Sequence, residues 1–240
     1  MALETRRLDK FLADHLQINR REVRILLARR TVSVDDKLVV DGNVLVNRFS
    51  KITLDGNVLQ AIEPRYFMLH KPVGVVSATT DKQHKTVLDL LSVTDSDGLH
   101  IAGRLDLNSS GLILLTDDSR WSEALAHPDK NVAKHYRVTL KNRLDESYID
   151  AFANGMYFPY EDIVTQPARL RIVSDYEADV WLTEGKYHQI KRMFGRFRNP
   201  VVALHRISIG AITLDNNLAP GYYRPLNPAE IESVFAAMQP

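Results

Sequence analysis

The sequence predicts an α+β protein of two domains. Apolar residues recur at helical spacing within residues 8–16, whereas an unbroken apolar run at 112–115 is typical of a buried strand. Between these segments, Glu63-Pro64 interrupts regular structure, because a proline restricts the backbone of the residue before it. We therefore expect a small N-terminal domain of residues 1–62 and a larger domain of residues 63–240.

Composition narrows the class of protein. A chain of 240 residues with 45% hydrophobic content is long enough to bury a substantial core. It contains no cysteine, which excludes disulfides, thiolate nucleophiles and cysteine-ligated metals. We find no signal-peptide core at the N-terminus and no run of 18 or more apolar residues. These features predict a cytoplasmic monomer without a membrane partner.

The N-terminal domain is expected to contain two helices followed by short strands. Asn19 with Glu22 three residues later is the pattern of a helix start, and it introduces the second helix. Arginines occupy one side of that helix and apolar residues the adjacent side, so the helix can dock and still present guanidinium groups to solvent. The strands that follow are separated by turns at Asp35-Asp36, Asp41-Gly42 and Asp55-Gly56.

Two basic clusters stand out against a formal net charge of +1. The first cluster consists of Arg20, Arg21, Arg24, Arg29 and Arg30. The second cluster lies within residues 186–206, which contain no Asp or Glu, and consists of Lys186, Lys191, Arg192, Arg196, Arg198 and Arg206. Either cluster alone is explained by a solvated surface, but two of them favour a polyanionic partner.

The larger domain is expected to begin with a buried strand at 66–69. A loop over 70–74 ends this strand, and residues 75–77 resume extended structure. Further along, a polar bend at 103–110 precedes the apolar run of the second buried strand. That arrangement presents Asp106 at a strand edge, and we take it as the candidate chemical centre. A helix cap or an ion pair is the ordinary alternative for a single aspartate.

Two further segments complete the larger domain. Residues 134–138 alternate as a short strand carrying Tyr136. Residues 180–193 predict a strand that meets Gly185 and turns into a helix. On that helix, His188, Lys191 and Arg192 are expected to share one face, opposite an apolar face that packs into the core.

Four segments of the larger domain resemble motifs of the RsuA-type pseudouridine synthases. They are PRYFMLHKPVGVV at 64–76, GRLDLNSSGLILLT at 103–116, EGKYHQIKRMF at 184–194 and LHRISIGAITLDNNLAPGYYRPL at 204–226. The chain departs from the family pattern at His70, where Asn is more familiar, and at Asn108 and Ser109, where an acid and a threonine are usual. The N-terminal quarter, with RRLDKFLADHL and NRREVRILLARRTVSVDD, resembles the S4 RNA-binding domain.

The resemblance implies a fold and an activity. The fold is an S4-like RNA-binding domain followed by a catalytic domain of mixed, mainly antiparallel β-sheet with flanking helices, the pseudouridine synthase fold. The activity is isomerisation of uridine to pseudouridine in RNA, which needs no cofactor and no metal. The arginines of the first cluster would contact RNA through the S4-like domain.

Three residues take catalytic roles by this resemblance. Asp106 is the catalytic carboxylate, acting by attack on C1′, by attack on C6 or by removal of the C2′ proton. Lys191 pairs with it, because a cation within about 4 to 6 Å keeps a carboxylate ionised. Arg192 is the alternative partner. Tyr136 stacks on the target base and accepts the C5 proton, although a tyrosine in a strand is also an ordinary core residue.

Five other residues are expected to bind substrate. Arg104 inserts toward the RNA or braces the loop once a base is flipped. Leu182 packs beside that base, with an ordinary core position as the alternative. The others, His188, Arg192 and Lys71, are candidate RNA contacts, with a structural role as the alternative for His188 and Lys71.

Small-subunit (16S) ribosomal RNA, in an assembly intermediate, is the expected partner. Large-subunit (23S) rRNA is the nearest alternative substrate, and a non-catalytic RNA-binding assembly factor is the alternative from another class. A glycoside hydrolase would need a second carboxylate beside the bond. Asp117 and Asp118 are more simply explained as a helix start.

Overall fold

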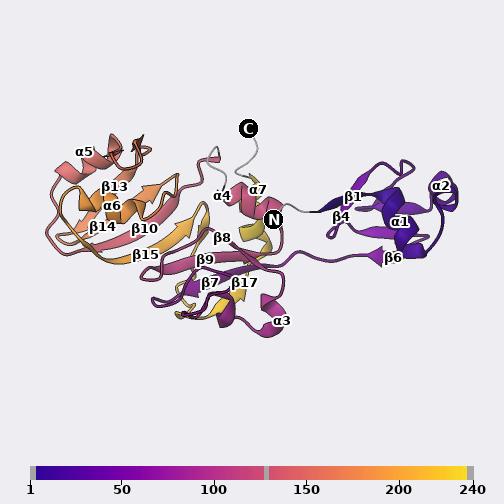
Figure 1. Ribbon diagram of the computed structural model, residues 1–240, viewed down its shortest axis with the longest axis horizontal. Coiled ribbons are helices and arrows are strands. Elements are labelled where there is room, and N and C mark those ends of the chain that lie inside the picture. Colours follow the sequence, from indigo (N-terminus) through magenta and orange to yellow (C-terminus); the bar gives the residue numbers. More distant parts are fainter. Residues whose placement is uncertain (1–3, 127–129, 237–240) are drawn as a thin grey trace. The chain divides into compact units, whose positions relative to one another are not determined.

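The computed structural model describes residues 4–126 and 130–236 (Figure 1). The chain divides into two compact units, formed mainly by residues 1–65 and mainly by residues 66–240. Each unit has an apolar core of its own. No helix in the described ranges combines the length and the apolar character needed to cross a membrane.

The N-terminal unit combines two helices with short antiparallel strands. The helices are α1 (Leu8–Leu16) and α2 (Arg20–Ala28). A four-stranded sheet has the order β3 (Lys37–Leu38), β2 (Val32–Val34), β5 (Ile52–Leu54) and β6 (Asn57–Gln60), and β1 (Thr5–Arg7) pairs with β4 (Leu45–Asn47). Apolar residues of both helices and of β2, β4 and β5 form the core.

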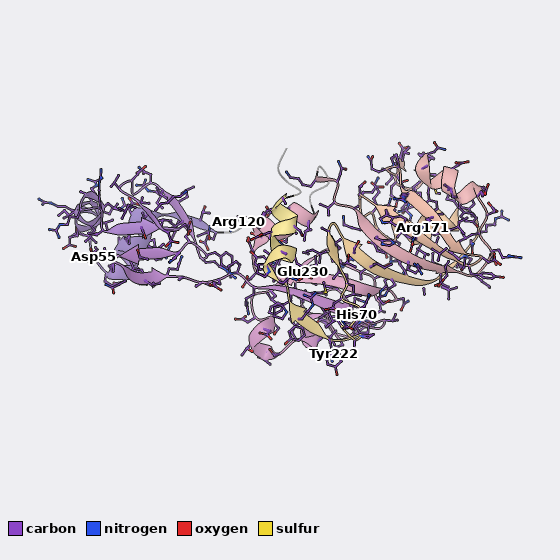
Figure 2. All side chains as sticks on the ribbon, turned by 180° about the vertical axis from the view of Figure 1, so that it is seen from behind. Asp55, His70, Arg120, Arg171, Tyr222 and Glu230 are labelled. Carbon is purple, nitrogen blue, oxygen red and sulfur yellow. The ribbon has the colours of Figure 1, made fainter. Side chains whose placement is uncertain are left out.

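Local sequence signals set the boundaries of this unit. The Asn19 side chain accepts hydrogen bonds from two backbone N–H groups of α2, and the Glu22 carboxylate accepts one from the Asn19 N–H. This is the predicted capping arrangement. The turn before β6 holds Asp55 (labelled in Figure 2) and Gly56 at φ 50° and 79°, a left-handed pair that suits a tight hairpin.

The larger unit is built on a nine-stranded sheet. Seven strands run in the order β13 (Arg169–Ser174), β14 (Glu177–Leu182), β10 (Lys134–Leu140), β15 (Val201–Ile209), β9 (Ser110–Thr116), β7 (Tyr66–Lys71) and β17 (Tyr223–Pro225). Two short strands extend it, β8 (His100–Ala102) beside β9 and β16 (Ile212–Thr213) beside β15. Among these pairings only β9 with β15 is parallel, which confirms a mixed, mainly antiparallel sheet.

Two cores cover the two faces of this sheet. Along β9, Ile113 and Leu115 enter one core while Leu112 and Leu114 enter the other, as expected when side chains alternate across a strand. The first core includes α5 (Ser147–Ala153) and α6 (Gln189–Gly195), and the second includes α4 (Ser119–Ala126) and α7 (Pro228–Ala236). Smaller elements are η1 (Leu88–Leu90), α3 (Val93–Ser96), β11 (Tyr157–Phe158) and β12 (Ile163–Val164).

The segment after β7 differs from the prediction. Residues 75–77 form an isolated bridge from Val76 to Thr86 instead of a strand. The segment is held by a contact with a distant loop, because the Ser77 hydroxyl donates to the Leu105 carbonyl at 2.7 Å and accepts from the Leu105 N–H at 3.0 Å. Ser77 thereby ties this segment to the 103–109 loop.

Candidate active site

Asp106 lies in the loop between β8 and β9, and its side chain is 32% exposed. Lys191 of α6 donates from Nζ to Asp106 Oδ2 at 3.0 Å. His188 Nε2 lies 3.3 Å from the same oxygen. Within the described residues no hydrogen bond or ion pair reaches Oδ1. One carboxylate oxygen is therefore held by the protein and the other is left for a ligand.

His188 occupies a different place from the predicted one. It precedes α6, with φ 49° and ψ 30° in the left-handed region, and so does not belong to the helix face of Lys191. The left-handed backbone turns its ring toward Asp106, and the Tyr187 ring stacks on it with centroids 3.9 Å apart. Gln189, Ile190, Met193 and Phe194 are buried, as the apolar face of the helix predicts.

A buried arginine braces the first half of the Asp106 loop. Arg206 of β15 is 1% exposed. Its guanidinium donates to the carbonyls of Gly103 at 2.6 Å, Arg104 at 3.2 Å and Leu112 at 2.8 Å. These hydrogen bonds are of the stronger kind, because the guanidinium donor is charged. Arg206 therefore fixes where the loop leaves β8 and enters β9.

A buried lysine braces the second half of the loop. The Lys71 side chain is fully buried, and its amine donates to the carbonyls of Ser109 at 2.6 Å, Pro72 at 3.0 Å and Leu107 at 3.4 Å. Burial lowers the pKa of Lys71 from 10.5 to about 8, against the opposing effect of the Asp106 charge. Lys71 is thus inaccessible to RNA, which corrects the expected substrate contact.

Gly111 makes the approach of Arg206 possible. Gly111 pairs with Arg206 across the parallel β9–β15 junction and has φ +110°. A Cβ atom at this position would lie 2.3 Å from the Arg206 carbonyl oxygen and 2.5 Å from its nitrogen. Only glycine fits such a close backbone contact at positive φ.

Asp106 lines two of three adjoining cavities. The inner cavity, of about 100 Å³, is lined among others by Asp106, Tyr136, Leu182, Ile190 and Lys191. The outer cavity, of about 480 Å³, shares Arg104, Asp106 and His188 with it and reaches Ser77, Asp81 and Tyr187. The third, of about 560 Å³, shares Arg104 and Tyr136 with the inner cavity and includes Lys134 and Arg206.

The inner cavity combines apolar walls with a few polar groups. Tyr136 is 8% exposed, and the Arg206 guanidinium lies 6.0 Å from its ring centroid. Ser109 also lines the cavity, and its hydroxyl is buried without a hydrogen-bond partner among the described residues. A buried hydroxyl of this kind calls for a ligand or a water molecule.

The expected substrate contacts separate into those at the cavities and those elsewhere. Arg104, Leu182 and His188 line the inner cavity. Arg192 lines none of the three, because it pairs with Glu161 and lies 4.0 Å above the Phe158 ring centroid. Its position therefore supports neither the pairing with Asp106 nor a contact with substrate.

The sequence interpretation missed three residues at the site. In the sequence, Arg206 counts only among the charges of the second cluster. Its place in a segment with apolar residues on both sides, beginning at Leu204, is the signal that could have indicated its burial. Ser77 and Tyr187 carried no pattern of their own. Asp117 and Asp118 line none of the three cavities, so neither supplies a second carboxylate there.

The first basic cluster is exposed throughout. Arg20, Arg21, Arg24, Arg29 and Arg30 all face solvent, and none forms an ion pair within the described residues. No group of three or more His, Asp or Glu side chains is placed to hold a metal ion in 4–126 and 130–236.

Comparisons with known proteins find similar chains over nearly the whole sequence. The family model described as RNA pseudouridylate synthase matches residues 65–195. A curated relative from Pseudomonas aeruginosa, ribosomal small subunit pseudouridine synthase A, is 50% identical over 229 residues, covering 95% of this chain and 100% of the relative. The protein of that name from Escherichia coli K12 is 42% identical over 235 residues, covering 95% and 99%. A crystal structure described as pseudouridylate synthase aligns with a TM-score of 0.70 and 38% identity, covering 95% of this chain and 99% of that one.

Proposed function

Since this chain belongs to the RNA pseudouridylate synthase family, we propose that it converts a uridine of small-subunit (16S) ribosomal RNA to pseudouridine. The membership makes it a pseudouridine synthase. The small-subunit substrate is supported by the names of the two relatives, which it resembles over nearly the whole chain.

The mechanism rests on one observation: the described residues form hydrogen bonds or ion pairs with only one of the two carboxylate oxygens of Asp106. The reaction breaks the N1–C1′ bond, turns the uracil and joins C5 to C1′. Attack on C1′, attack on C6 and removal of the C2′ proton all need an ionised carboxylate with a free oxygen. Lys191 and His188 hold Oδ2, which leaves Oδ1 for the substrate.

We place the target uracil in the inner cavity against Tyr136. Its ring offers a stacking surface, and its hydroxyl is the candidate acceptor for the C5 proton. Leu182 and Ile190 supply the apolar walls that retain the detached base. Ser109 supplies a hydroxyl for the polar edge of the uracil. A base reaches this cavity only after leaving its stack, so the proposal includes base flipping, with Arg104 contacting the RNA at the cavity wall.

We propose that the N-terminal unit is an S4-like RNA-binding domain. Its support is the exposed face of α2, where Arg20, Arg21 and Arg24 stand free of ion pairs in the described residues. Guanidinium groups in this state are available to phosphates. An assembly intermediate of the small subunit is the form of RNA in which the target uridine is most open to the enzyme.

A tritium-release assay tests the proposal. Purified protein is incubated with 16S or 23S rRNA transcripts carrying tritium at uracil C5, and label released to water is counted. We expect release from 16S rRNA that reaches one equivalent per transcript. Release from 23S rRNA alone would assign the large subunit instead. Tight RNA binding without release, from either transcript and from small-subunit assembly intermediates carrying the same label, would identify a non-catalytic assembly factor.

A further inference from the structure

We propose that the outer cavity binds the nucleobase adjacent to the target uridine, stacked on Tyr187. The proposal rests on the function proposed above and adds a second nucleotide subsite to it. The enzyme would then recognise two consecutive nucleotides at the catalytic loop, the target in the inner cavity and its neighbour in the outer one.

The first support is the continuity of the two cavities. Arg104, Asp106 and His188 belong to the walls of both. If the ribose of the target uridine lies at Asp106, the RNA backbone next to it passes these shared residues. The outer cavity, at about 480 Å³, is larger than the inner one and lies along this exit.

The second support is an exposed and already ordered aromatic ring. The Tyr187 side chain is 76% exposed and lines the outer cavity. One face of its ring stacks on His188 at 3.9 Å and 21°, and His188 is itself held by Asp106. The tyrosine is thus supported from one side, and a nucleobase can stack on the other.

The third support is an uncommitted cation between the cavities. Arg104 is exposed, and its guanidinium forms no ion pair or hydrogen bond within the described residues. Its backbone is fixed, because Arg206 donates to the Arg104 carbonyl. A guanidinium in this position suits the phosphate that joins two nucleotides, one bound on each side of it.

An experiment that combines a substitution at Tyr187 with the removal of one base from the RNA tests the subsite. The substrate is the shortest 16S rRNA fragment from which the wild-type enzyme releases tritium, made intact and with an abasic nucleotide on the 5′ or the 3′ side of the target. The variants are Tyr187→Ala and Tyr187→Phe. Tyr222→Ala is the matched control, because Tyr222 (labelled in Figure 2) is 66% exposed and lines none of the three cavities.

We expect Tyr187→Ala to lower kcat/KM on the intact fragment by roughly 5- to 100-fold, while Tyr187→Phe and Tyr222→Ala stay near wild type. At one of the two neighbouring positions, the abasic fragment should cost the wild-type enzyme a similar factor and should not penalise Tyr187→Ala further. Equal losses for Tyr187→Ala on intact and abasic fragments would overturn the subsite, as would no loss at all. Failure of the proposed function is separate, since the wild-type enzyme would then release no tritium from any rRNA.

Discussion

The first basic cluster, on and after α2, and the second, within residues 186–206, look alike in sequence but have different surroundings. Every arginine of the first faces solvent without an ion pair in the described part of the chain. In the second, Lys191 pairs with Asp106, Lys186 with Glu184 and Arg192 with Glu161. Arg206 is buried on backbone carbonyls, and only Arg196 and Arg198 stay exposed without an ion pair among the described residues.

The difference shows that density of positive charge along the sequence does not by itself tell which cations are available to an external anion. In the second cluster, most of the cations are held by carboxylates or backbone carbonyls of the protein itself. In the first, they are free to meet an external anion. We therefore expect substitutions in the second cluster to change the chemical step or the fold, and substitutions in the first to change RNA affinity and its dependence on salt.

The largest effect on kcat should come from replacing Asp106, the carboxylate that pairs with Lys191 of the second cluster. Asp106→Asn keeps the size of the side chain but removes its charge. We expect kcat to fall by about 10⁴-fold or more, as for the loss of other essential nucleophiles, with RNA affinity within a factor of about three. Single-turnover tritium release and filter binding measure the two quantities. Wild-type turnover by Asp106→Asn would refute the proposed mechanism.

A matched pair of substitutions sharpens the comparison between clusters. Lys191→Met removes the ammonium that holds Asp106 Oδ2 at 3.0 Å, so we expect kcat to fall by about 10²-fold. Lys191→Arg should recover part of the activity. Arg20→Met removes one cation from the first cluster and should leave kcat unchanged. Equal losses of kcat from Lys191→Met and Arg20→Met would abolish the distinction.

The contribution of the first cluster should appear in how RNA affinity depends on ionic strength. Replacing Arg20, Arg21 and Arg24 together by Gln should weaken RNA binding about 10-fold or more in moderate salt. It should also reduce the slope of log affinity against log salt by about 2 to 3, since each lost phosphate contact removes about 0.7 to 0.9. The double variant Arg196→Gln/Arg198→Gln is the counterpart from the second cluster. An equal change of slope there would show that this cluster also contacts RNA.

A smaller effect should appear in the pH dependence of stability. The pKa of Lys71 is lowered by burial to about 8, whereas the unfolded chain keeps it near 10.5. Between these values the unfolded chain binds a proton that the folded protein does not, so stability should rise with pH across this window. The rise is at most about 1.4 kcal/mol per pH unit. Urea unfolding at pH 8 and pH 10 should show it in the wild type but not in Lys71→Met, and parallel profiles would contradict it.

Local patterns predicted the elements that depend on neighbouring residues. The Asn19–Glu22 cap, the apolar face of α6 and the buried strand after Asp106 all follow from spacings of a few residues. The proximity of Lys191 to Asp106 was reached only through the family motif. Their separation of 85 positions is closed by packing of α6 into the first core, which no local pattern encodes.

The parts that could not be predicted depend on contacts between distant segments. The buried state of Arg206 follows from the parallel β9–β15 pairing and the close fit at Gly111. Arg192 forms its ion pair away from the site, with Glu161, which lies in the turn after β11. His188 leaves the helix face because its backbone adopts a left-handed conformation, which is uncommon for any residue other than glycine.

Under the proposed function, the fixed Asp106 loop leaves the change of conformation to the RNA. Arg206, Ser77 and Lys71 bind the loop carbonyls at Gly103, Arg104, Leu105, Leu107 and Ser109. A scaffold tied down in this manner has little freedom to reshape itself around an incoming helix. The enzyme would then select among uridines by the free energy needed to unstack each one. A loosely paired uridine would be preferred before any contact identifies the base.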